Sequence, residues 1–291
     1  MTLDQLRIFI AVADRQHMTE AAKQLNLTQS AASAAIATLE ARYNIKLFDR
    51  IGRGIVLTRA GHAFLKEARA VVGRAHAAEQ VLDDLAGLRT GQLTISASQT
   101  VANYWLPPRL QAFQRKYPGI KVHVRITNTE LAARDVHDGL ADLAVVEGQL
   151  DDPVLSTRKS GGDELVIVVA PDHSFVKLKK LTAESLRQTP WIVLEQGSGT
   201  RTMFASALRK YGLNLSDLTI ELELASNEAI CTAVRTGHCA SALSELVVAE
   251  SLAAGSLVKA RVELTSRSFY ILRHKERYLS SAEAEFTTFL Q

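Results

Sequence analysis

Two short polar segments carry residue types that could hold an anion. Each follows a predicted strand and opens the next helix; they comprise Ser98, Gln99 and Thr100 in the first, and Ser198, Gly199, Thr200 and Arg201 in the second. The first backbone N–H groups of a helix have no partner within it and lie at the positive end of the helix dipole. Together with several hydroxyl groups and one guanidinium, they predict a site for a small anion.

Thr129 and Asn227 precede predicted helices in the same way and complete the set of expected ligand contacts. The alternative is that Ser98 and Thr200 only cap their helices, which is a common role for both residue types. Glu147 follows another predicted strand, and its carboxylate disfavours an anion nearby unless it is paired or solvated.

A second set of residues is suited to contacting DNA. The helix predicted from Thr28 to Tyr43 has, opposite its apolar stripe, a face of small residues with few hydrogen-bond donors. Such a face fits deep in the major groove and leaves Gln29, Ser30 and Ser33 to read base edges. The alternative is an alanine-rich helix buried in protein. We expect DNA contacts from Thr28, Gln29, Ser30, Ser33, Ala34, Thr38, Arg50 and Arg53.

The charge distribution permits DNA binding. Residues 1–90 contain 12 Lys and Arg against 9 Asp and Glu, whereas the rest of the chain has 22 of each. Five basic residues fall close together, namely Arg42, Lys46, Arg50, Arg53 and Arg59. A basic run of this kind attracts phosphate groups, although a net charge of +3 also fits an ordinary solvated surface.

The motifs of catalytic and metal chemistry are missing from the sequence. The eight histidines are dispersed without an HExxH pattern. Cys231 and Cys239 fit neither CxxC nor a zinc spacing, so we expect them to pack in the interior, with a redox switch as the alternative. The Gly-Ser-Gly of residues 197–199 lacks the third glycine of a dinucleotide site and the lysine of a P-loop. We therefore expect no catalytic residue, no metal and no cofactor.

The elements that hold the DNA-contacting residues have helix-turn-helix proportions. Apolar residues at helical spacing predict helices over 3–13, 19–25 and 28–43. Thr19 and Thr28 are the expected N-caps, and Asn26 suits the left-handed turn between the second and third helices. Residues 47–57 alternate about a Gly-Arg-Gly tip, which predicts a hairpin, or wing, with Gly52 and Gly54 at positive φ.

A long helix is predicted from Thr58 to about Leu88. Its apolar residues are spaced alternately four and three apart, as in a coiled-coil seam; they are Phe64, Ala68, Val71, Ala75, Ala78, Leu82 and Leu85. No other predicted helix adjoins it in the sequence, so the seam predicts a dimer interface. Packing against its own chain is the alternative.

Beyond Gly91 the predicted strands alternate with helices. The strands cover residues 93–97, 121–126, 142–146, 164–170, 191–194, 219–224 and 240–243. This alternation predicts a mostly parallel sheet, and its restart near residue 164 predicts two lobes with a cleft between them. In such folds ligands bind beyond the carboxyl ends of the strands, where both anion-binding segments fall.

Composition places the chain among ordinary globular proteins. Of the 291 residues, 47% are apolar and 22% charged, and no apolar run is long enough to span a bilayer. The first residues do not resemble a signal peptide, and two cysteines are too few for a disulfide framework. We expect a cytoplasmic protein without a membrane partner.

The segments AAKQLNLTQSAAS, IATLE, LFDR and LTRAG occur in the order and spacing of the LysR-type transcriptional regulators, which this chain resembles over essentially its whole length. The resemblance implies an all-α winged helix-turn-helix domain over 1–58, a linker and dimerisation helix over 59–90, and an α/β effector domain over 91–291. The last is two-lobed and similar to periplasmic binding proteins, with lobe I at about 91–162 and 267–291 and lobe II at about 163–266.

The same resemblance implies a homodimer or homotetramer that binds double-stranded DNA, and it admits RNA polymerase as a partner. The segments SQTVANYWLP and EQGSGTR resemble the branch that regulates sulfur assimilation, which suggests sulfite or sulfate as effector, with a small organic acid as the alternative. Ser30 and Ala34 stand where family members commonly carry Pro and Arg. We therefore expect more of the DNA specificity to come from DNA shape and from Arg53 in the minor groove.

The prediction is a sequence-specific DNA-binding transcription regulator, not an enzyme, controlled by a small-molecule effector between the two lobes. A solute-binding protein or an enzyme built on the lobes is the main alternative, but it would need a signal peptide or a convergent catalytic set. A nucleoid protein without a ligand would leave some 200 neutral residues without a role. Salt-dependent DNA binding by the intact chain discriminates among them.

Overall fold

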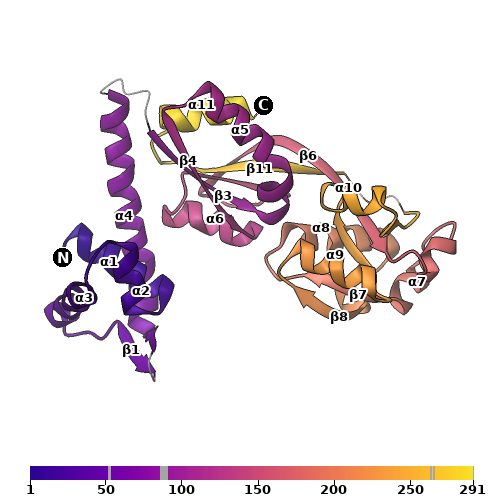
Figure 1. Cartoon of the computed structure of the whole chain (residues 1–291), viewed down its shortest axis with the longest axis horizontal. Helices are drawn as coiled ribbons and strands as arrows, with labels where there is room; N and C mark the ends of the chain where they lie inside the picture. The colour runs from indigo at the N-terminus through magenta and orange to yellow at the C-terminus, as the bar shows by residue number, and fades with distance from the viewer. Residues whose placement is uncertain (52–53, 86–90, 263, 265, 291) are drawn as a thin grey trace. The chain divides into compact units, whose positions relative to one another are not determined.

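The computed structural model describes the chain apart from residues 52–53, 86–90, 263, 265 and 291 (Figure 1). Two compact units are present, one made of Met1–Gly87 with His137–Leu140 and the other of Leu88–Val136 with Ala141–Gln291. Within the described ranges, no helix has the length and apolar character needed to cross a membrane.

The first unit is a winged helix-turn-helix domain followed by a long helix. Its elements are α1 (Leu3–Arg15), α2 (Met18–Gln24), α3 (Gln29–Tyr43), β1 (Phe48–Ile51), β2 (Gly54–Leu57) and α4 (Arg59–Leu85). The ring of Phe9 on α1 lies at the centre of the core, 5.3 Å from the ring of Phe48 and 4.9 Å from that of Phe64. Ile36 and Leu39 of α3 join the same apolar cluster. One core therefore fixes α3, the wing and the start of α4 together.

Capping side chains set the turn between α2 and α3. The Thr28 hydroxyl accepts a hydrogen bond from the Ala31 N–H at 3.2 Å, and Asn26 adopts a φ of 55°, which confirms both predictions. The predicted cap of α2 is wrong: the helix begins at Met18, and Nδ1 of His17 accepts from the Glu20 N–H at 3.4 Å. An imidazole nitrogen can replace a hydroxyl here because capping needs only an acceptor near the first free amides.

The wing is the predicted hairpin. β1 and β2 pair antiparallel from Phe48 opposite Leu57 to Ile51 opposite Gly54. Gly54 does not have the predicted positive φ, because it is already the first residue of the extended strand β2. The predictions for Gly52 and Arg53 lie outside the described residues.

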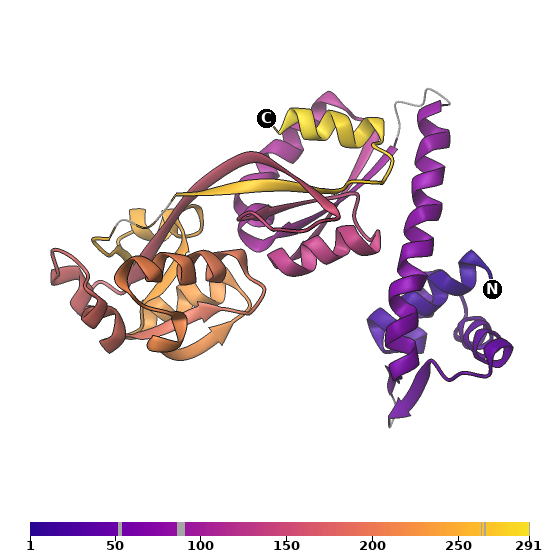
Figure 2. The same ribbon diagram turned by 180° about the vertical axis from the view of Figure 1, so that it is seen from behind.

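The second unit is a two-lobed α/β domain, in which two long strands, β6 (Leu155–Val169) and β11 (Ser266–His274), extend along both lobes (Figures 1 and 2). Lobe I contains β3 (Gly91–Ser98), the π-helical turn η1 (Val101–Trp105), α5 (Leu106–Lys116), β4 (Ile120–Thr127), α6 (Thr129–Asp138), β5 (Leu143–Glu147) and α11 (Ser281–Phe289). Lobe II contains η2 (Ser174–Lys177), α7 (Ala183–Gln188), β7 (Pro190–Leu194), α8 (Gly199–Leu208), η3 (Arg209–Tyr211), η4 (Leu215–Asp217), β8 (Thr219–Leu224), α9 (Asn227–Thr236), β9 (Ser241–Ser244), α10 (Glu245–Ala253) and β10 (Val258–Lys259).

The large sheet is mixed, which corrects the prediction of a mostly parallel one. Its strand order is β10-β6-β11-β5-β3-β4, with β9 also paired to β6. β3 runs parallel to β4 and β5, but β11 is antiparallel to both β5 and β6. The reason is topological: the chain enters lobe II along β6 and returns along β11, so the two strands must run in opposite directions. β7 and β8 form a separate parallel pair.

Buried aromatic rings fix the helices that begin near the cleft. Phe113 of α5 meets Phe286 of α11 edge to face, with ring centres 4.9 Å apart. Trp191 of β7 lies 4.9 Å from Phe204 of α8, and its indole N–H donates to the Leu186 carbonyl at 2.9 Å. The first contact holds α5 to α11, and the second holds α8 against β7 and so positions the amino-terminal end of α8.

Candidate functional site

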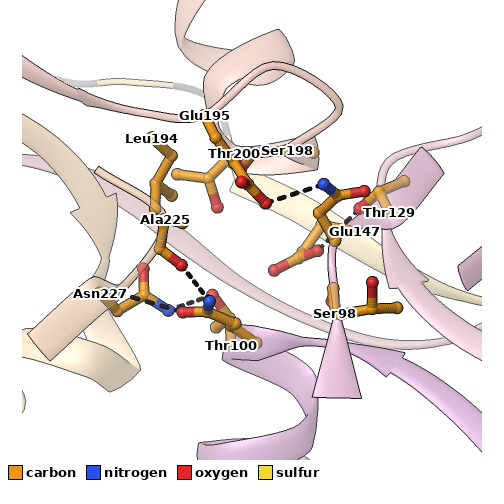
Figure 3. Close-up of a pocket in the computed structure, with 14 residues that line it drawn as sticks. Ser98, Thr100, Thr129, Glu147, Leu194, Glu195, Ser198, Thr200, Ala225 and Asn227 are labelled. Atoms are coloured by element: carbon orange, nitrogen blue, oxygen red, sulfur yellow. Dashed lines mark hydrogen bonds between the residues drawn. The ribbon is translucent and has the colours of Figure 1, made fainter. Parts of the chain in front are cut away.

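A pocket lies between the lobes of the second unit (Figure 3). The centre of a water molecule has about 20 Å³ of space inside it, and its wall is formed by residues at the carboxyl ends of β3, β4, β5, β7 and β8. Eight of the nine residues expected to contact a ligand line it; they are Ser98, Gln99, Thr100, Thr129, Ser198, Gly199, Thr200 and Asn227. A cavity needs roughly 10–15 Å³ on this measure to hold one water molecule, so the closed pocket has room for little more than that, and a larger ligand requires the lobes to part.

Two hydroxyl groups in the pocket already accept hydrogen bonds, which leaves their protons free to donate. The Thr200 hydroxyl accepts from Nη1 of Arg267 at 2.7 Å. The Thr100 hydroxyl accepts from the Asn227 side-chain amide at 3.4 Å. A hydroxyl has one donor and two acceptor positions, so each of these groups can still donate to a ligand oxygen. Thr129 differs, because its hydroxyl donates to the Glu147 carboxylate at 3.1 Å.

Two buried polar atoms of the pocket have no hydrogen-bond partner in the described part of the chain. They are Oγ of Ser98 and Oδ1 of Asn227, and their residues are 2% and 1% exposed. A buried polar atom left unpaired costs about 1–3 kcal/mol, so such atoms are rare in folded proteins. Their position in the wall of a pocket indicates that a ligand or water supplies the missing partner.

The charges around the pocket centre on Arg267, which sequence analysis did not identify. This buried guanidinium on β11 is paired with Asp163 of β6 through two of its nitrogens, the Nη2–Oδ2 distance being 2.9 Å. Nη1 also lies 4.0 Å from Oε1 of Glu147. Glu147 thus lies within ion-pair distance of Arg267, but it shares that guanidinium with Asp163, which holds it more closely.

Hydrogen bonds join the two lobes around the pocket. The Gln99 side chain donates to the Ala225 carbonyl and accepts from the Asn227 N–H at 3.2 Å. On the other side, the Asn128 amide donates to the Glu195 carboxylate at 2.8 Å. Figure 3 draws these bonds as dashed lines that end at Ala225, Asn227 and Glu195. These hydrogen bonds must therefore break before the two lobes can move apart and open the pocket.

Arg201 does not line the pocket, which corrects its prediction as an effector contact. Its guanidinium donates to the Leu194 carbonyl at 2.9 Å and pairs with Glu223 of β8. Both partners belong to lobe II, so this side chain ties α8 to its own sheet. Its backbone N–H is capped by the Ser198 hydroxyl at 3.4 Å.

Sequence reasoning missed several residues of the pocket wall, namely Thr127, Asn128, Leu194, Glu195 and Ala225. Most of them end strands or precede helices, so the rule that ligands bind beyond strand ends could have found them. Arg267 gave no such signal, because its pairing with Asp163 joins positions 104 residues apart.

Seven of the eight expected DNA-contacting residues fall in the described part of the first unit, on α3, at its cap or on the wing, and Arg53 lies outside it. Thr28, Gln29, Ser30, Ala34 and Thr38 are exposed, and Ser33 is partly exposed. Gln29, Ser33 and Arg50 line a groove between α3 and the wing. The Thr38 hydroxyl donates to the Ala34 carbonyl at 2.8 Å, so its proton is already used within the helix.

A buried carboxylate fixes the wing against α3. Oε1 of Glu40 accepts from the Leu47 and Phe48 N–H groups at 2.8 and 3.2 Å, and Oε2 accepts from Nζ of Lys46 at 2.9 Å. Burial alone would raise the pKa of Glu40, but the bonds from Lys46, Leu47 and Phe48 outweigh it, so the pKa lies below its ordinary value. Glu40 therefore sets the position of Arg50 relative to the exposed face of α3.

The predicted dimer seam divides into two parts. Phe64 and Ala68 pack into the core of the first unit, and Ala68 is only 1% exposed, so these two residues do not face a second chain. Here the alternative of packing within the chain is correct. The rest of the seam is exposed or partly exposed and comprises Val71, Ala75, Ala78, Leu82 and Leu85. It remains a predicted interface.

Comparison with known proteins identifies both units. Residues 3–62 match the model of a bacterial regulatory helix-turn-helix protein of the lysR family, and residues 86–291 match the LysR substrate binding domain. The chain is 35% identical over 290 residues to a probable RuBisCO transcriptional regulator of Cyanidioschyzon merolae, covering 98% of this chain and 96% of that protein. A protein of the same description from Cyanophora paradoxa is 33% identical over 291 residues, covering 98% and 90%.

Two solved structures are similar over large parts of the chain. Full-length CbnR, complexed with its target DNA, has a TM-score of 0.69 at 22% identity and covers 100% of this chain and 99% of that one. The regulatory domain of CcmR from Synechocystis PCC6803, in complex with 2-PG, has a TM-score of 0.63 at 26% identity and covers 69% and 96%. These relatives are not described as sulfur regulators.

Proposed function

Because the chain belongs to the LysR family of DNA-binding transcriptional regulators with an effector-binding domain, we propose that its pocket binds a small oxyanion and that this ligand controls transcription. The observation that carries the proposal is the unpartnered, buried hydroxyl of Ser98 in the pocket wall, which can donate to a ligand oxygen. An oxyanion would accept from the hydroxyls of Ser98, Thr100 and Thr200. The similar CcmR domain, which was solved in complex with 2-PG, supports a small ligand in this class of domain.

Hydroxyl groups and helix ends are the donors that would hold an anion in this pocket. The amino-terminal turns of α6, α8 and α9 begin at the pocket, and each contributes partial positive charge. The charge of Arg267 is balanced by Asp163, so its contribution is the hydrogen bond to Thr200, which leaves the Thr200 proton free for a ligand. Glu147 and Glu195 oppose an anion, but both already accept hydrogen bonds from lobe I, from Thr129 and Asn128.

The unpaired Oδ1 of Asn227 restricts the ligand chemistry further, because this oxygen accepts hydrogen bonds and needs a donor from the ligand. We expect the effector to carry an O–H group, as a hydroxy acid or a hydrogen-bearing oxyanion does, or to bind with a water. Hydrogen sulfite and small hydroxy acids fit this requirement, whereas sulfate and simple carboxylates, which carry no O–H near neutral pH, fit it only with a bridging water.

The experiment is a thermal-melting screen of the full chain with small oxyanions, pairing each hydroxy acid with its deoxy analogue. A ligand at about 100 times its Kd should stabilise the folded state by about 2.7 kcal/mol and raise the melting temperature. Ser98→Ala should lower the affinity about 10- to 100-fold, the value of a hydrogen bond to a charged group. Its melting without ligand should not fall, because Ser98 Oγ has no described partner to lose.

Thr202→Ala is the matched control, since this exposed threonine is on α8 but its hydroxyl donates to the Ser198 carbonyl and does not line the pocket.

A cationic ligand is the second candidate, favoured by the carboxylates of Glu147 and Glu195 in the wall. If small amines raise the melting temperature and oxyanions do not, the anion proposal is wrong. The effector found should then be tested for its effect on binding to RuBisCO promoter DNA, the target that the names of the relatives suggest first.

A further inference from the structure

Lobe II carries three side chains with metal-binding atoms at a place separate from the pocket. Glu221 is on β8, and His238 and Cys239 lie just before β9. The carboxylate oxygen, imidazole nitrogen and thiol sulfur all lie within 4.8 Å of one another. None of the three residues lines the pocket, which is at the carboxyl ends of β7 and β8. The proposed anion site makes no use of them.

Two of the three separations of these atoms are close to the edges of a metal-centred tetrahedron, and the third is within 4.8 Å. Oε2 of Glu221 is 3.2 Å from Nε2 of His238 and 3.4 Å from Sγ of Cys239. Zinc binds sulfur at about 2.3 Å and nitrogen or oxygen at about 2.0–2.2 Å, which places ligand atoms of a tetrahedral site about 3.3–3.6 Å apart. Little rearrangement is therefore needed for one cation to contact all three atoms.

We propose that Glu221, His238 and Cys239 bind one Zn²⁺ ion, with solvent water as the fourth ligand. A thiolate, an imidazole and a carboxylate together suit zinc better than the hard cations Mg²⁺ and Ca²⁺, which prefer oxygen. When the cation binds, the Cys239 S–H bond is broken, a Zn–S bond forms and the proton leaves to solvent.

The surroundings allow a cation to enter while holding the ligands in place. The side chains of His238 and Glu221 are 75% and 45% exposed, whereas Cys239 is buried. The next residue, Ala240, is anchored to β7 by hydrogen bonds of 2.9 Å to Pro190 and Ile192. The ring of His173 also forms a hydrogen bond with the backbone of His238. Such fixed surroundings orient the ligands before the metal arrives.

Without a metal, the same contacts form an ordinary hydrogen-bonded group. Burial, with the carboxylate of Glu221 beside it, raises the pKa of the Cys239 thiol to about 11, so the thiol keeps its proton and donates to Glu221. This metal-free arrangement is the competing explanation of the geometry, and the experiment must separate the two.

The test uses the full chain, first treated with a chelator and dialysed. We expect titration calorimetry with Zn²⁺ to give one site per chain, and Co²⁺ to give a thiolate-to-metal absorption band in the near ultraviolet. His238→Ala and Cys239→Ser should each weaken Zn²⁺ binding by more than about tenfold, since even loss of an outer-shell partner costs about 10- to 100-fold. Cys239→Ser should also abolish the band.

Two control variants make the result specific to this site. Cys231→Ala removes the other free thiol, which is buried on α9, and His123→Ala removes an exposed histidine on β4. Both should bind Zn²⁺ as the wild type does. Because His238 is exposed, its replacement should leave the fold intact, so a loss of binding there supports the proposal. Absence of a one-to-one site, or equal binding by wild type and His238→Ala, would overturn it.

Discussion

Single side chains in this protein act mainly through the groups that hold them. Arg267 does not line the pocket, yet its hydrogen bond decides that the Thr200 hydroxyl has a proton to offer a ligand. Glu40 does not belong to the exposed face of α3, yet it fixes the wing beside that face. Replacing such a residue should therefore displace the groups that contact the ligand or the DNA, although the residue itself makes no such contact.

Glu40 provides a test at this scale. Glu40→Ala leaves the buried Leu47 N–H without its acceptor, and an unpaired buried amide costs about 1–3 kcal/mol. We expect a lower melting temperature of the first unit and faster amide hydrogen exchange at Leu47 and Phe48. Glu20→Ala is the control, because its exposed carboxylate pairs only with Lys23. Unchanged exchange in β1 would contradict the assigned role.

The pH dependence of this contribution follows from the lowered pKa of Glu40. A carboxyl whose pKa is depressed by folding adds stability that is fully present above its unfolded pKa, about 4.3, and is lost as pH falls through the folded value. The difference in melting temperature between wild type and Glu40→Ala should therefore be constant near pH 7 and shrink below about pH 4. If the difference in melting temperature grew on acidification, the pKa of Glu40 would be raised by folding and not lowered.

At the scale of elements, the exposed face of α3 is expected to read DNA with few polar groups. Gln29→Ala or Ser33→Ala should each cost about 1–3 kcal/mol at the specific site if the side chain makes a good base contact. Arg50→Ala should weaken binding to all sequences and reduce the salt dependence. Gel-shift titrations at two salt concentrations separate these effects, with Arg15→Ala, outside the groove, as control. Equal affinity of all three variants and wild type would refute the DNA-binding surface.

The second half of α4 is expected to form a dimer interface, because its seam residues are exposed or partly exposed within one chain. Ala75→Glu or Ala78→Glu places a charge in a closely packed alanine seam, where it cannot easily reach water. We expect a lower dimer fraction by light scattering and weaker cooperative binding to paired half-sites. Ala77→Glu, off the seam, should change neither. If both seam variants kept the molecular mass of the wild type in light scattering, the dimer interface would have to lie elsewhere.

At the scale of the second unit, the two lobes are in close contact at Gly199. A Cβ added there would lie 2.6 Å from Oγ1 of Thr129 and 2.7 Å from the Glu147 carbonyl oxygen, so the lobes would have to separate. Gly199→Ala should therefore lower effector affinity by at least about tenfold, if closure is needed for the hydroxyls of both lobes to reach one ligand.

Calorimetry with the effector found in the screen checks this prediction, and Gly91→Ala is the matched control. A Cβ on Gly91 would lie 3.8 Å from the Ala282 Cβ, an ordinary contact. Normal effector affinity in Gly199→Ala would mean that the lobes need not close at this point.

The local features of the fold could be predicted because neighbouring residues carry them. The α3 cap at Thr28, the left-handed turn at Asn26 and the bounds of α6 and β8 agree with the sequence patterns. The strand ends that meet at the pocket were also predictable, because parallel strands align their carboxyl ends. The prediction failed for the cap of α2, because His17 and not Thr19 accepts the first free amide. It also failed for Arg201, because its guanidinium bonds to the Leu194 carbonyl within its own lobe and does not reach the pocket.

The sequence by itself determined the helix-turn-helix, the wing, the alternating elements of the two lobes and eight residues of the pocket, since caps, turns and periodicity depend on residues close in the chain. Only the tertiary structure decided that β6 and β11 pair along both lobes and bring Arg267 to Asp163, and that Phe64 and Ala68 pack inward. It alone brought Glu221 to His238 and Cys239. Those contacts join residues distant in sequence, and strand pairing and core packing, not local pattern, determine which of them meet.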